Sequence, residues 1–348
     1  MNRPLNTAII GLGRIAWKLE KDPLRYHPCT HAGTILEKGK RKFMIRKAFD
    51  RSPENHREFK EWSGLSYEEL PAFSAKSQPG EIDLAVICAP SEFHFSAAET
   101  CIRAGVPALL IEKPLCLTLK EARKLAALSA KHGTKIWVNF ERRYHPSYQW
   151  IRSAVAEEKF GPIRSVTGRV LTGTPSPQAK IGPLLHDGIH WIDLLLFLLG
   201  KPRRTDGQLK KMPKARTEHT AWIQFDYGDF QAHLEAGGRR RYFEFYFQID
   251  FERARIMAGN EGFRLFISEK SSLYSNFLDL KEKKYPAVWR NPWSALYEEI
   301  YSEMNSARGH GRLRKSSIIT SGILDSVQGM ELIQAIENSN PGPDRAKV

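Results

Sequence analysis

Apolar segments of strand length alternate with helical patterns through the first 140 residues. The strand-like runs lie at residues 7–10, 43–49, 84–88, 108–112 and 135–139. Runs such as DLAVICAP and PALLIEKP are apolar on both faces, which is typical of central parallel strands that helices cover on each side. One intervening helix is expected to begin after Thr118, with Glu121 at capping-box spacing, and to end before Gly133. This alternation predicts an α/β domain with a doubly wound parallel sheet over residues 1–140.

The pattern changes after residue 141. Helical periods cover residues 147–158 and 184–199, and a strand is expected at residues 163–171. Two alternating runs then flank Tyr227 and Gly228, which is a hairpin signal, and YFEFYFQIDF alternates with a period of two. Consecutive strands of this kind predict a largely antiparallel sheet with helices on one face, closed by a helix over residues 317–337. We therefore expect a second, α+β domain over residues 141–348.

The chain of 348 residues exceeds the usual size of one compact domain and, at 41% hydrophobic residues, supports a sizeable core. Its longest apolar stretches fall far short of the roughly 20 residues that cross a bilayer, so no membrane partner is expected. An apolar run begins at Thr7, which leaves no room for a secretory signal, and we expect a cytoplasmic protein. Four well-separated cysteines without C-x-x-C spacing predict buried thiols: Cys29, Cys88, Cys101 and Cys116.

The formal net charge of +14 raises the question of nucleic-acid binding, because clustered Lys and Arg side chains neutralise phosphates. The basic clusters at residues 38–47, 239–241 and 312–315 lie in separate segments and carry no recognised nucleic-acid motif. We therefore expect no nucleic-acid partner. A solvated surface that places a positive field over an anionic cofactor or substrate explains the charge.

The sequence TAIIGLGRIA places a G-x-G-x-x-A motif at the turn from the first strand to the first helix. Gly11 allows the tight turn, Gly13 lets a pyrophosphate approach the backbone, and the small Ala16 lets helix and strand pack closely. With Arg14 and Ile15 between them, these residues predict a loop that holds phosphate against a helix N-terminus. Because the motif follows the first strand of a βαβ series, we interpret the domain as a Rossmann fold that binds a nicotinamide dinucleotide. A tight turn that binds nothing is the alternative.

An acidic residue that pairs with the adenosine ribose hydroxyls is expected where the second strand ends, and Asp50 stands there in FMIRKAFDRS. An acid at this position favours NAD, while Arg51 keeps NADP open because a neighbouring arginine can take a 2′-phosphate. The separation from Gly13 exceeds the usual spacing of about 20 residues, which we attribute to an insertion around residues 22–30. The alternative is that Asp50 caps a loop.

Two further segments carry polar groups where apolar or loop residues are expected. Glu112 and Lys113 stand in IEKP at the C-terminal end of a buried strand, the edge at which open α/β sheets bind ligands. In LLHDGIHWIDLLLFLLG, His186, His190 and Asp193 fall at i, i+4 and i+7, so they share one face of an ideal helix. Two histidines at this spacing also occur in zinc sites, and a buried core histidine at 190 is a further alternative. We expect no metal, because no third histidine or cysteine motif accompanies them.

These motifs together resemble those of the Gfo/Idh/MocA oxidoreductase family over nearly the whole chain. The matching features are GLGRIA, DLAVICAPSEFH, the EKP tripeptide, FERRYHP and GIHWID. The resemblance implies a Rossmann domain, a second domain with an open-faced mixed sheet, and hydride transfer between NAD(P) and a carbon that bears a hydroxyl or carbonyl group. It also implies a substrate that is a sugar, a cyclitol, or a nucleotide-linked or acidic derivative. The basic charge favours the anionic kinds.

The resemblance assigns roles to individual residues. Lys113 matches the family lysine held near the reacting oxygen, where its charge stabilises a developing alkoxide. His190 matches the histidine that exchanges a proton with the substrate hydroxyl, and Asp193 matches an aspartate that supports the helix or the substrate. The residues that the resemblance places around the cofactor are Ala89, Pro90, His94, Glu112, Lys113 and Arg143.

One position departs from the family pattern. Many of these dehydrogenases carry D-x-x-x-H, whereas here His186 takes the place of the aspartate and the acid moves to Asp187. On an ideal helix Asp187 points about 100° away from the direction of His186, so it inherits the role only through a local distortion. The alternatives are that His186 contacts the substrate itself, or that Lys113 and His190 suffice as a pair.

Two classes of function follow. The first is an enzyme that oxidises or reduces a secondary alcohol, and the second is a non-catalytic, dinucleotide-sensing or regulatory protein that lost its chemistry at His186. The intact pair of Lys113 and His190 favours the enzyme. The aromatic positions at 242–251 are expected to form a sheet surface that another subunit covers, which predicts a homodimer or homotetramer through the second domain.

Overall fold

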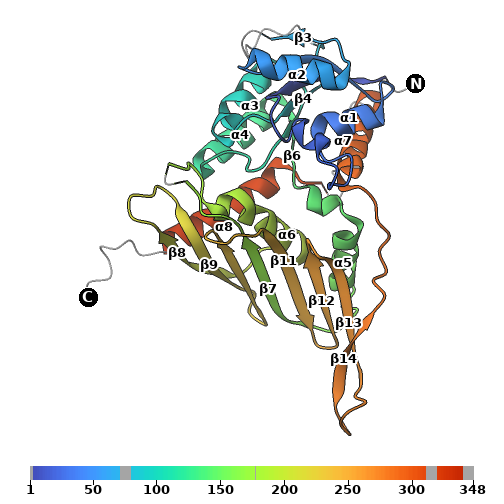
Figure 1. The fold of residues 1–348 in the computed structure, drawn as a ribbon, viewed down its shortest axis with the longest axis vertical. Coiled ribbons are helices and arrows are strands. Elements are labelled where there is room, and N and C mark those ends of the chain that lie inside the picture. Colours follow the sequence, from blue (N-terminus) through green and yellow to red (C-terminus); the bar gives the residue numbers. More distant parts are fainter. Residues whose placement is uncertain (1–2, 71–79, 177, 311–319, 340–348) are drawn as a thin grey trace. The chain divides into compact units, whose positions relative to one another are not determined.

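The computed structural model of the chain describes residues 3–70, 80–176, 178–310 and 320–339 (Figure 1). The chain forms two compact units, the first from residues 1–145 and 289–327, the second from residues 146–288 and 328–348. The chain therefore returns to the first unit near its end, and a single boundary at residue 140 does not capture this arrangement. The basic cluster at residues 312–315 lies outside the described residues.

The first unit contains the doubly wound parallel sheet that the sequence predicts. The strand order is β3-β2-β1-β4-β5-β6, so the order reverses between β1 and β4. Helices α3 and α4 pack together on one side and α1 and α7 on the other, which explains why β4 and β5 are wholly buried (Figure 1). The strands are β1 (Leu5–Ile10), β2 (Phe43–Phe49), β3 (Glu68–Glu69), β4 (Leu84–Ile87), β5 (Ala108–Ile111) and β6 (Lys135–Val138). The helices are α1 (His31–Lys38), α2 (Pro53–Ser63), α3 (His94–Arg103), α4 (Leu119–His132) and α7 (Pro292–His310).

The connection from β1 to α1 differs from the expected one. No α-helix begins at the glycine loop, because residues 14–17 form turns and a short 3₁₀ helix, η1 (Lys18–Lys21), follows them. Residues 22–30, to which the long spacing was attributed, form an irregular segment, within which Pro23 and Pro28 lack the N–H that a helix needs. Helix α1 starts only at His31, where two N–H groups of its first turn already donate to the carbonyls of residues 15 and 16. The expectation that an α-helix begins directly at the glycine loop is therefore wrong for this chain.

The capping box predicted for α4 is confirmed. The Thr118 hydroxyl accepts a hydrogen bond from the backbone N–H of Glu121, whose carboxylate accepts in return from the N–H of Thr118. The helix ends at Gly133, which has a φ of +68°. The structure thus bears out both signals that the sequence placed around this helix.

The second unit is built on a mixed sheet of order β14-β13-β12-β11-β7-β10-β9-β8. Strands β7 and β10 pair in parallel and the other neighbouring pairs are antiparallel, as the sequence predicts. The expected hairpin joins β9 to β10, and Gly228 at its turn has a φ of +91°. The strands are β7 (Ile163–Leu171), β8 (Arg204–Lys211), β9 (Glu218–Asp226), β10 (Gln231–Gly237), β11 (Glu244–Phe251), β12 (Ala254–Gly259), β13 (Gly262–Lys270) and β14 (Leu278–Lys283). The helices are α5 (Pro146–Ala156), α6 (Ile189–Leu199) and α8 (Ile323–Ser339), which begins in the first unit.

The aromatic residues of β11 correct one expectation. Phe245, Phe247 and Phe251 alternate with polar residues and are buried within the unit, where Trp191 of α6 lies 4.9 Å from Phe247 between ring centroids. Residues on the alternate positions form ion pairs across strands, for example Arg169 with Glu244 at 2.8 Å. The unit's own core therefore accounts for these three aromatic residues, whereas Tyr242 and Phe243 of the same segment are 56% and 52% exposed.

Cys29, Cys88, Cys101 and Cys116 are free and buried, as predicted. Among the described residues, no helix combines the length and the apolar character that crossing a bilayer demands.

Candidate active site

The glycine loop follows β1 at the point where the strand order reverses, which is where open α/β sheets bind ligands. Gly11 has a φ of +91°, and a Cβ atom there would lie 2.7 Å from the backbone nitrogen of Ala89, so only glycine fits. A Cβ atom on Gly13 would meet nothing within 4 Å. One glycine is thus required by the fold, while the other borders open space that a phosphate group can enter.

A pocket of about 1080 Å³ opens beside this loop. Among the residues predicted to bind the cofactor, those that line it are Gly11, Gly13, Arg14, Ile15, Asp50, Arg51, Ala89 and Pro90. Ala16 is fully buried beneath the loop, in keeping with its expected packing role. The lining residues that the sequence did not single out are Ile10, Leu19, Phe49, Ser52, Asn55, Cys88, Phe93, Ser96, Ala97 and Thr100.

Asp50 stands at the end of β2, and its carboxylate is held by three groups of the protein. Oδ2 accepts a hydrogen bond from the N–H of Leu12 at 2.7 Å, while Oδ1 accepts from the N–H of Ser52 at 2.8 Å and from Asn55 Nδ2 at 3.0 Å. The aspartate therefore connects the glycine loop to the start of α2. This is the role that the alternative interpretation, in which Asp50 caps a loop, expects of it. Its place in the pocket lining also leaves it available to ribose hydroxyls.

The pocket lining also combines a cation with an aromatic ring. The guanidinium carbon of Arg51 lies 5.0 Å from the ring centroid of Phe93, and both residues line the pocket. A flat group such as a nucleobase finds complementary faces here. With the open glycine loop and the Asp50 carboxylate, this lining fits the adenosine and pyrophosphate parts of a dinucleotide.

Glu112 and Lys113 follow β5 at the same edge of the sheet. The Glu112 carboxylate is buried and accepts hydrogen bonds from His31 Nε2 at 2.9 Å, Asn139 Nδ2 at 2.6 Å and the N–H of Lys113 at 3.1 Å. Burial alone raises the pKa of Glu112, but its hydrogen bond with His31 and the other polar neighbours outweigh burial and lower the pKa below its ordinary value. Lys113 is partly exposed beside this carboxylate.

The side chains of His94 and Arg143 are buried and form hydrogen bonds with backbone carbonyl groups. The buried imidazole of His94 lies 2.7 Å from the carbonyl oxygen of Pro114 and 2.8 Å from that of Ala89, so it joins the loops after β4 and β5, and burial lowers its pKa. Arg143 is 3% exposed, and its Nη1 donates to the carbonyl of Thr320 at 3.2 Å. Five of the predicted cofactor residues are not among those that line the pocket: Ala16, His94, Glu112, Lys113 and Arg143.

The histidine segment of the second unit is not one continuous α-helix. A π-helical turn, η4 (Leu184–Gly188), precedes α6, and His190 is the second residue of that helix. Its i→i+5 bonding changes the angle between successive side chains, so the face expected for His186 on an ideal helix does not hold. His186 Nδ1 lies 3.0 Å from Asp187 Oδ2, and the His186 side chain is 57% exposed. Asp193 is buried and His190 is partly buried.

Glu218 supports the π-helical turn and was not foreseen from the sequence. Its Oε1 accepts a hydrogen bond from the N–H of Leu184 at 3.0 Å, and burial raises its pKa. The carboxylate also lies against Gly182, where a Cβ atom would overlap it. The sequence signals for this support are Gly182, just before LLHDG, and Glu218, at the start of β9.

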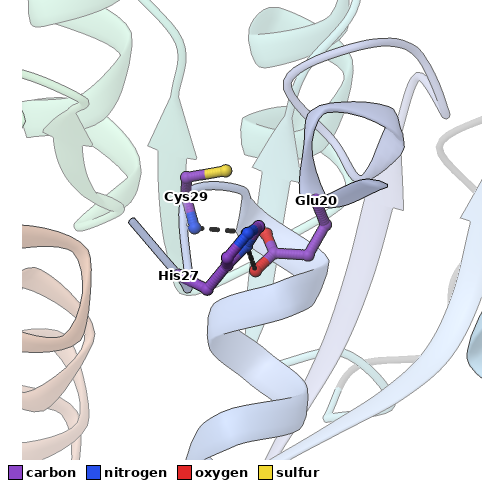
Figure 2. Close-up of side chains that lie close together, drawn as sticks. All are labelled: Glu20, His27 and Cys29. Carbon is purple, nitrogen blue, oxygen red and sulfur yellow. Dashed lines mark hydrogen bonds and ion pairs between the residues drawn. The ribbon is translucent and has the colours of Figure 1, made fainter. Parts of the chain in front are cut away.

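A second unforeseen cluster lies in the insertion after the glycine loop (Figure 2). The Glu20 carboxylate accepts hydrogen bonds from the N–H of Cys29 at 3.1 Å and from the Thr30 hydroxyl at 2.6 Å, and His27 Nδ1 lies 2.9 Å away. Glu20, His27 and Cys29 are also close enough to share a metal ion. Burial, followed by the charge of Glu20, raises the pKa of the Cys29 thiol to about 12. The protein's own donors thus already occupy the Glu20 carboxylate, which braces the insertion.

Comparisons with known proteins agree with this architecture. Residues 5–140 match the model of an oxidoreductase family with an NAD-binding Rossmann fold, and residues 148–257 match the GFO/IDH/MocA C-terminal domain. A solved structure of an inositol dehydrogenase homolog complexed with NAD+ from Azotobacter vinelandii superimposes with a TM-score of 0.77, at 19% sequence identity, covering 99% of this chain and 97% of that one. This likeness shows a shared fold.

Curated relatives match part of the chain. Inositol 2-dehydrogenase of Rhizobium meliloti is 30% identical over 137 residues, which are 38% of this chain and 41% of the relative. UDP-N-acetylglucosamine 3-dehydrogenase of Acidithiobacillus ferrooxidans is 32% identical over 120 residues, which are 34% of this chain and 37% of the relative. The chain thus spans less than half the length of these curated relatives. Because the two family models together cover most of the chain, it belongs to the GFO/IDH/MocA oxidoreductase family.

Proposed function

We propose that this chain is a nicotinamide-dependent oxidoreductase that interconverts a secondary alcohol and a ketone on a sugar, a cyclitol or a nucleotide-linked sugar. The observation that carries the proposal is the pocket at the reversal of strand order, where an open glycine loop and the carboxylate of Asp50 lie together. When bound there, the nicotinamide cofactor supplies or accepts the hydride. The relatives whose names include inositol and UDP-N-acetylglucosamine support this substrate range.

Each polar residue has one task in this proposal. The ammonium of Lys113 stabilises negative charge on the reacting substrate oxygen, as a fixed cation does at a developing alkoxide. His190 takes the hydroxyl proton during oxidation and returns it during reduction, a task that histidine side chains commonly perform in enzymes. His186 and Asp187, paired at 3.0 Å, lie one turn before it and contact the substrate or relay the proton.

Around the cofactor, Asp50 binds the adenosine ribose and favours NAD(H), while Arg51 leaves NADP(H) as the second choice. The loop residues after β4, Ala89 and Pro90, border the pocket near the glycine loop. In this proposal His94 serves the cofactor by joining the loops after β4 and β5, and Glu112 does so by holding the N–H of Lys113. Arg143 acts at a distance, through its bond to the carbonyl of Thr320.

An anionic substrate is favoured by the charge of the second unit. Lys210 and Arg239 lie close enough to the buried His219 that, after burial itself, their charges lower its pKa. Arg239 follows β10 by two residues, and that strand packs against η4. A carboxylate or phosphate on the substrate would meet this positive field near the histidine segment.

The test is turnover by purified protein, followed by nicotinamide absorbance, on a panel of inositols, sugars, sugar acids and UDP-linked sugars. We expect oxidation of at least one member with NAD+, and loss of that activity by about 10³-fold or more in Lys113→Met with NADH affinity retained. Full activity of Lys113→Met would overturn the catalytic assignment. NADH binding without turnover on any member would favour the sensing or regulatory role that the departure at His186 allows.

The quaternary structure and location are also proposals. A homodimer or homotetramer through the sheet of the second unit is supported by exposed apolar side chains there, such as Trp222 at 44%. Sedimentation velocity would reveal a monomer if this is wrong. Four buried free thiols suit a reducing compartment, which supports a cytoplasmic location.

A further inference from the structure

A chain of buried polar groups leads from helix α7 to the proposed catalytic lysine. His31 Nδ1 lies 2.8 Å from the Tyr297 hydroxyl, and His31 Nε2 lies 2.9 Å from Glu112 Oε1. The other carboxylate oxygen, Oε2, accepts the backbone N–H of Lys113 at 3.1 Å. Tyr297 and His31 are fully buried and Glu112 is 7% exposed, so these groups are shielded from water. No catalytic role in the proposed reaction uses His31 or Tyr297.

The start of α1 holds His31 in place. Thr30 caps the helix by accepting a hydrogen bond from the N–H of Gly33, and its hydroxyl donates to the Glu20 carboxylate. A Cβ atom at position 33 would overlap that carboxylate, so glycine is needed for Glu20 to reach the first turn. A carboxylate at this end of a helix also interacts favourably with the helix dipole. The insertion therefore fixes the residue from which the His31 side chain projects.

The protonation states of Tyr297 and Glu112 determine which ring nitrogen of His31 carries a hydrogen. Burial raises the pKa of Tyr297 well above its ordinary value, so its hydroxyl stays protonated at physiological pH. Glu112 is held in its ionised form, because hydrogen bonds outweigh the effect of burial on its pKa. An ionised carboxylate accepts hydrogen bonds only, so His31 Nε2 must carry a hydrogen toward it. The Nε2–H group of His31 thus orients one oxygen of Glu112 and leaves the other facing Lys113.

We propose that His31 is a positioning residue for Lys113: its Nε2–H fixes the Glu112 carboxylate, and that carboxylate in turn fixes the backbone of the lysine. The inference rests on the proposed function of Lys113. Asn139 donates to the same oxygen as His31, at 2.6 Å, so the two donors together define the plane of the carboxylate. Loss of His31 leaves a buried charge with one side-chain donor, and the carboxylate then rotates away from the Lys113 amide.

Two amide substitutions at position 31 distinguish the positioning role of His31 from a contribution to packing alone. His31→Gln keeps an amide nitrogen near the place of Nε2, whereas His31→Asn keeps one near the place of Nδ1 and loses the donor to Glu112. Both remove the imidazole and its edge contact with Trp293, whose ring centroid lies 5.0 Å away, so both lose similar packing. A difference between them therefore reports the Nε2 donor.

The first readout needs neither substrate nor cofactor. Amide hydrogen exchange of the peptide that contains Lys113 is measured by mass spectrometry on the apo full-length protein. We expect the Lys113 amide to exchange about 10-fold faster in His31→Asn and within about 3-fold of the unmodified protein in His31→Gln, the size of one lost hydrogen bond. Tyr297→Phe removes only the hydroxyl and is expected to accelerate the same amide less, which provides a second variant if His31→Asn does not fold.

The second readout is steady-state kinetics on a substrate found in the panel. His31→Asn is expected to lower kcat by about 10- to 100-fold with KM and NADH affinity little changed, because a misplaced catalytic group costs rate and His31 does not line the cofactor pocket. His31→Gln is expected to recover most of that loss. Equal exchange and equal kcat in the two variants would overturn the inference. Full activity of Lys113→Met would instead overturn the proposed function, so the two failures are distinguishable.

Discussion

The two units present their candidate functional residues in different ways. In the first unit, backbone geometry fixes the site, since Gly11 is pressed against Ala89 and the Asp50 carboxylate holds the N–H of Leu12. In the second unit, the histidine segment opens with a π-helical turn, and His186 extends into solvent with Asp187 beside it. The proposed cofactor site thus depends on strand ends, whereas the proposed proton-handling segment contains a π-helical turn, a local irregularity that is frequent at functional sites.

The histidines of the second unit give the largest expected effect. His190→Asn should lower kcat by about 10³-fold, because general acid–base catalysis by one side chain contributes about 10²- to 10⁴-fold. His186→Asn should lower it by less than about 10-fold, since that side chain is largely exposed and paired with Asp187. Steady-state kinetics with NADH affinity as a control checks both variants. A larger loss for His186 than for His190 would show that the departure from D-x-x-x-H moved the proton relay to His186.

The two glycines of the first unit make a matched pair. Gly11→Ala should destabilise the fold by about 2–4 kcal/mol, because it combines a φ of +91° with a Cβ atom 2.7 Å from the Ala89 nitrogen. Gly13→Ala should leave the melting temperature unchanged, since its Cβ atom meets no protein atom within 4 Å. It should still weaken NADH binding by about 100-fold, because the new methyl group occupies the space of the pyrophosphate.

Calorimetry measures the stability of each glycine variant, and fluorescence titration measures its affinity for NADH. Unchanged NADH affinity in Gly13→Ala would place the pyrophosphate elsewhere. Unchanged stability in Gly11→Ala would show that the first unit is less rigid at this edge than its close contacts indicate.

The smallest expected effect is a pH dependence of the first unit's stability, and it arises from His145. Burial, followed by the charge of Arg142, lowers the pKa of His145 from its usual value near 6.5 to about 4. The unfolded chain therefore binds a proton at a higher pH than the folded protein, so this histidine costs stability as the pH falls from about 6.5 to about 4. His145→Phe keeps a ring beside Trp289, whose centroid lies 5.1 Å away, and should reduce the loss. Melting temperatures between pH 7 and pH 4.5 test this, and parallel curves for the two proteins would contradict it.

Much of the first unit follows from local sequence. The glycine motif, the acid at the end of β2 and the capping box of α4 each depend on a few neighbouring residues, and the structure contains all three. Helix α7 was not foreseen, although its residue Tyr297 lies against His31 across 266 positions of sequence. Such a contact has no local signal, because burial of a tyrosine hydroxyl beside a histidine depends on how distant helices pack.

What the sequence by itself determined is therefore the alternation of strands and helices over the first 140 residues, the glycine loop, and the polar residues at the ends of β2 and β5. These features follow from periodicity, turn chemistry and the backbone freedom of glycine, all of which act over a few residues. The tertiary structure alone decided that α1 begins after the insertion, that a π-helical turn precedes His190, and that His31 meets Glu112. Those outcomes depend on which buried donors and acceptors find partners, and long-range packing settles that pairing.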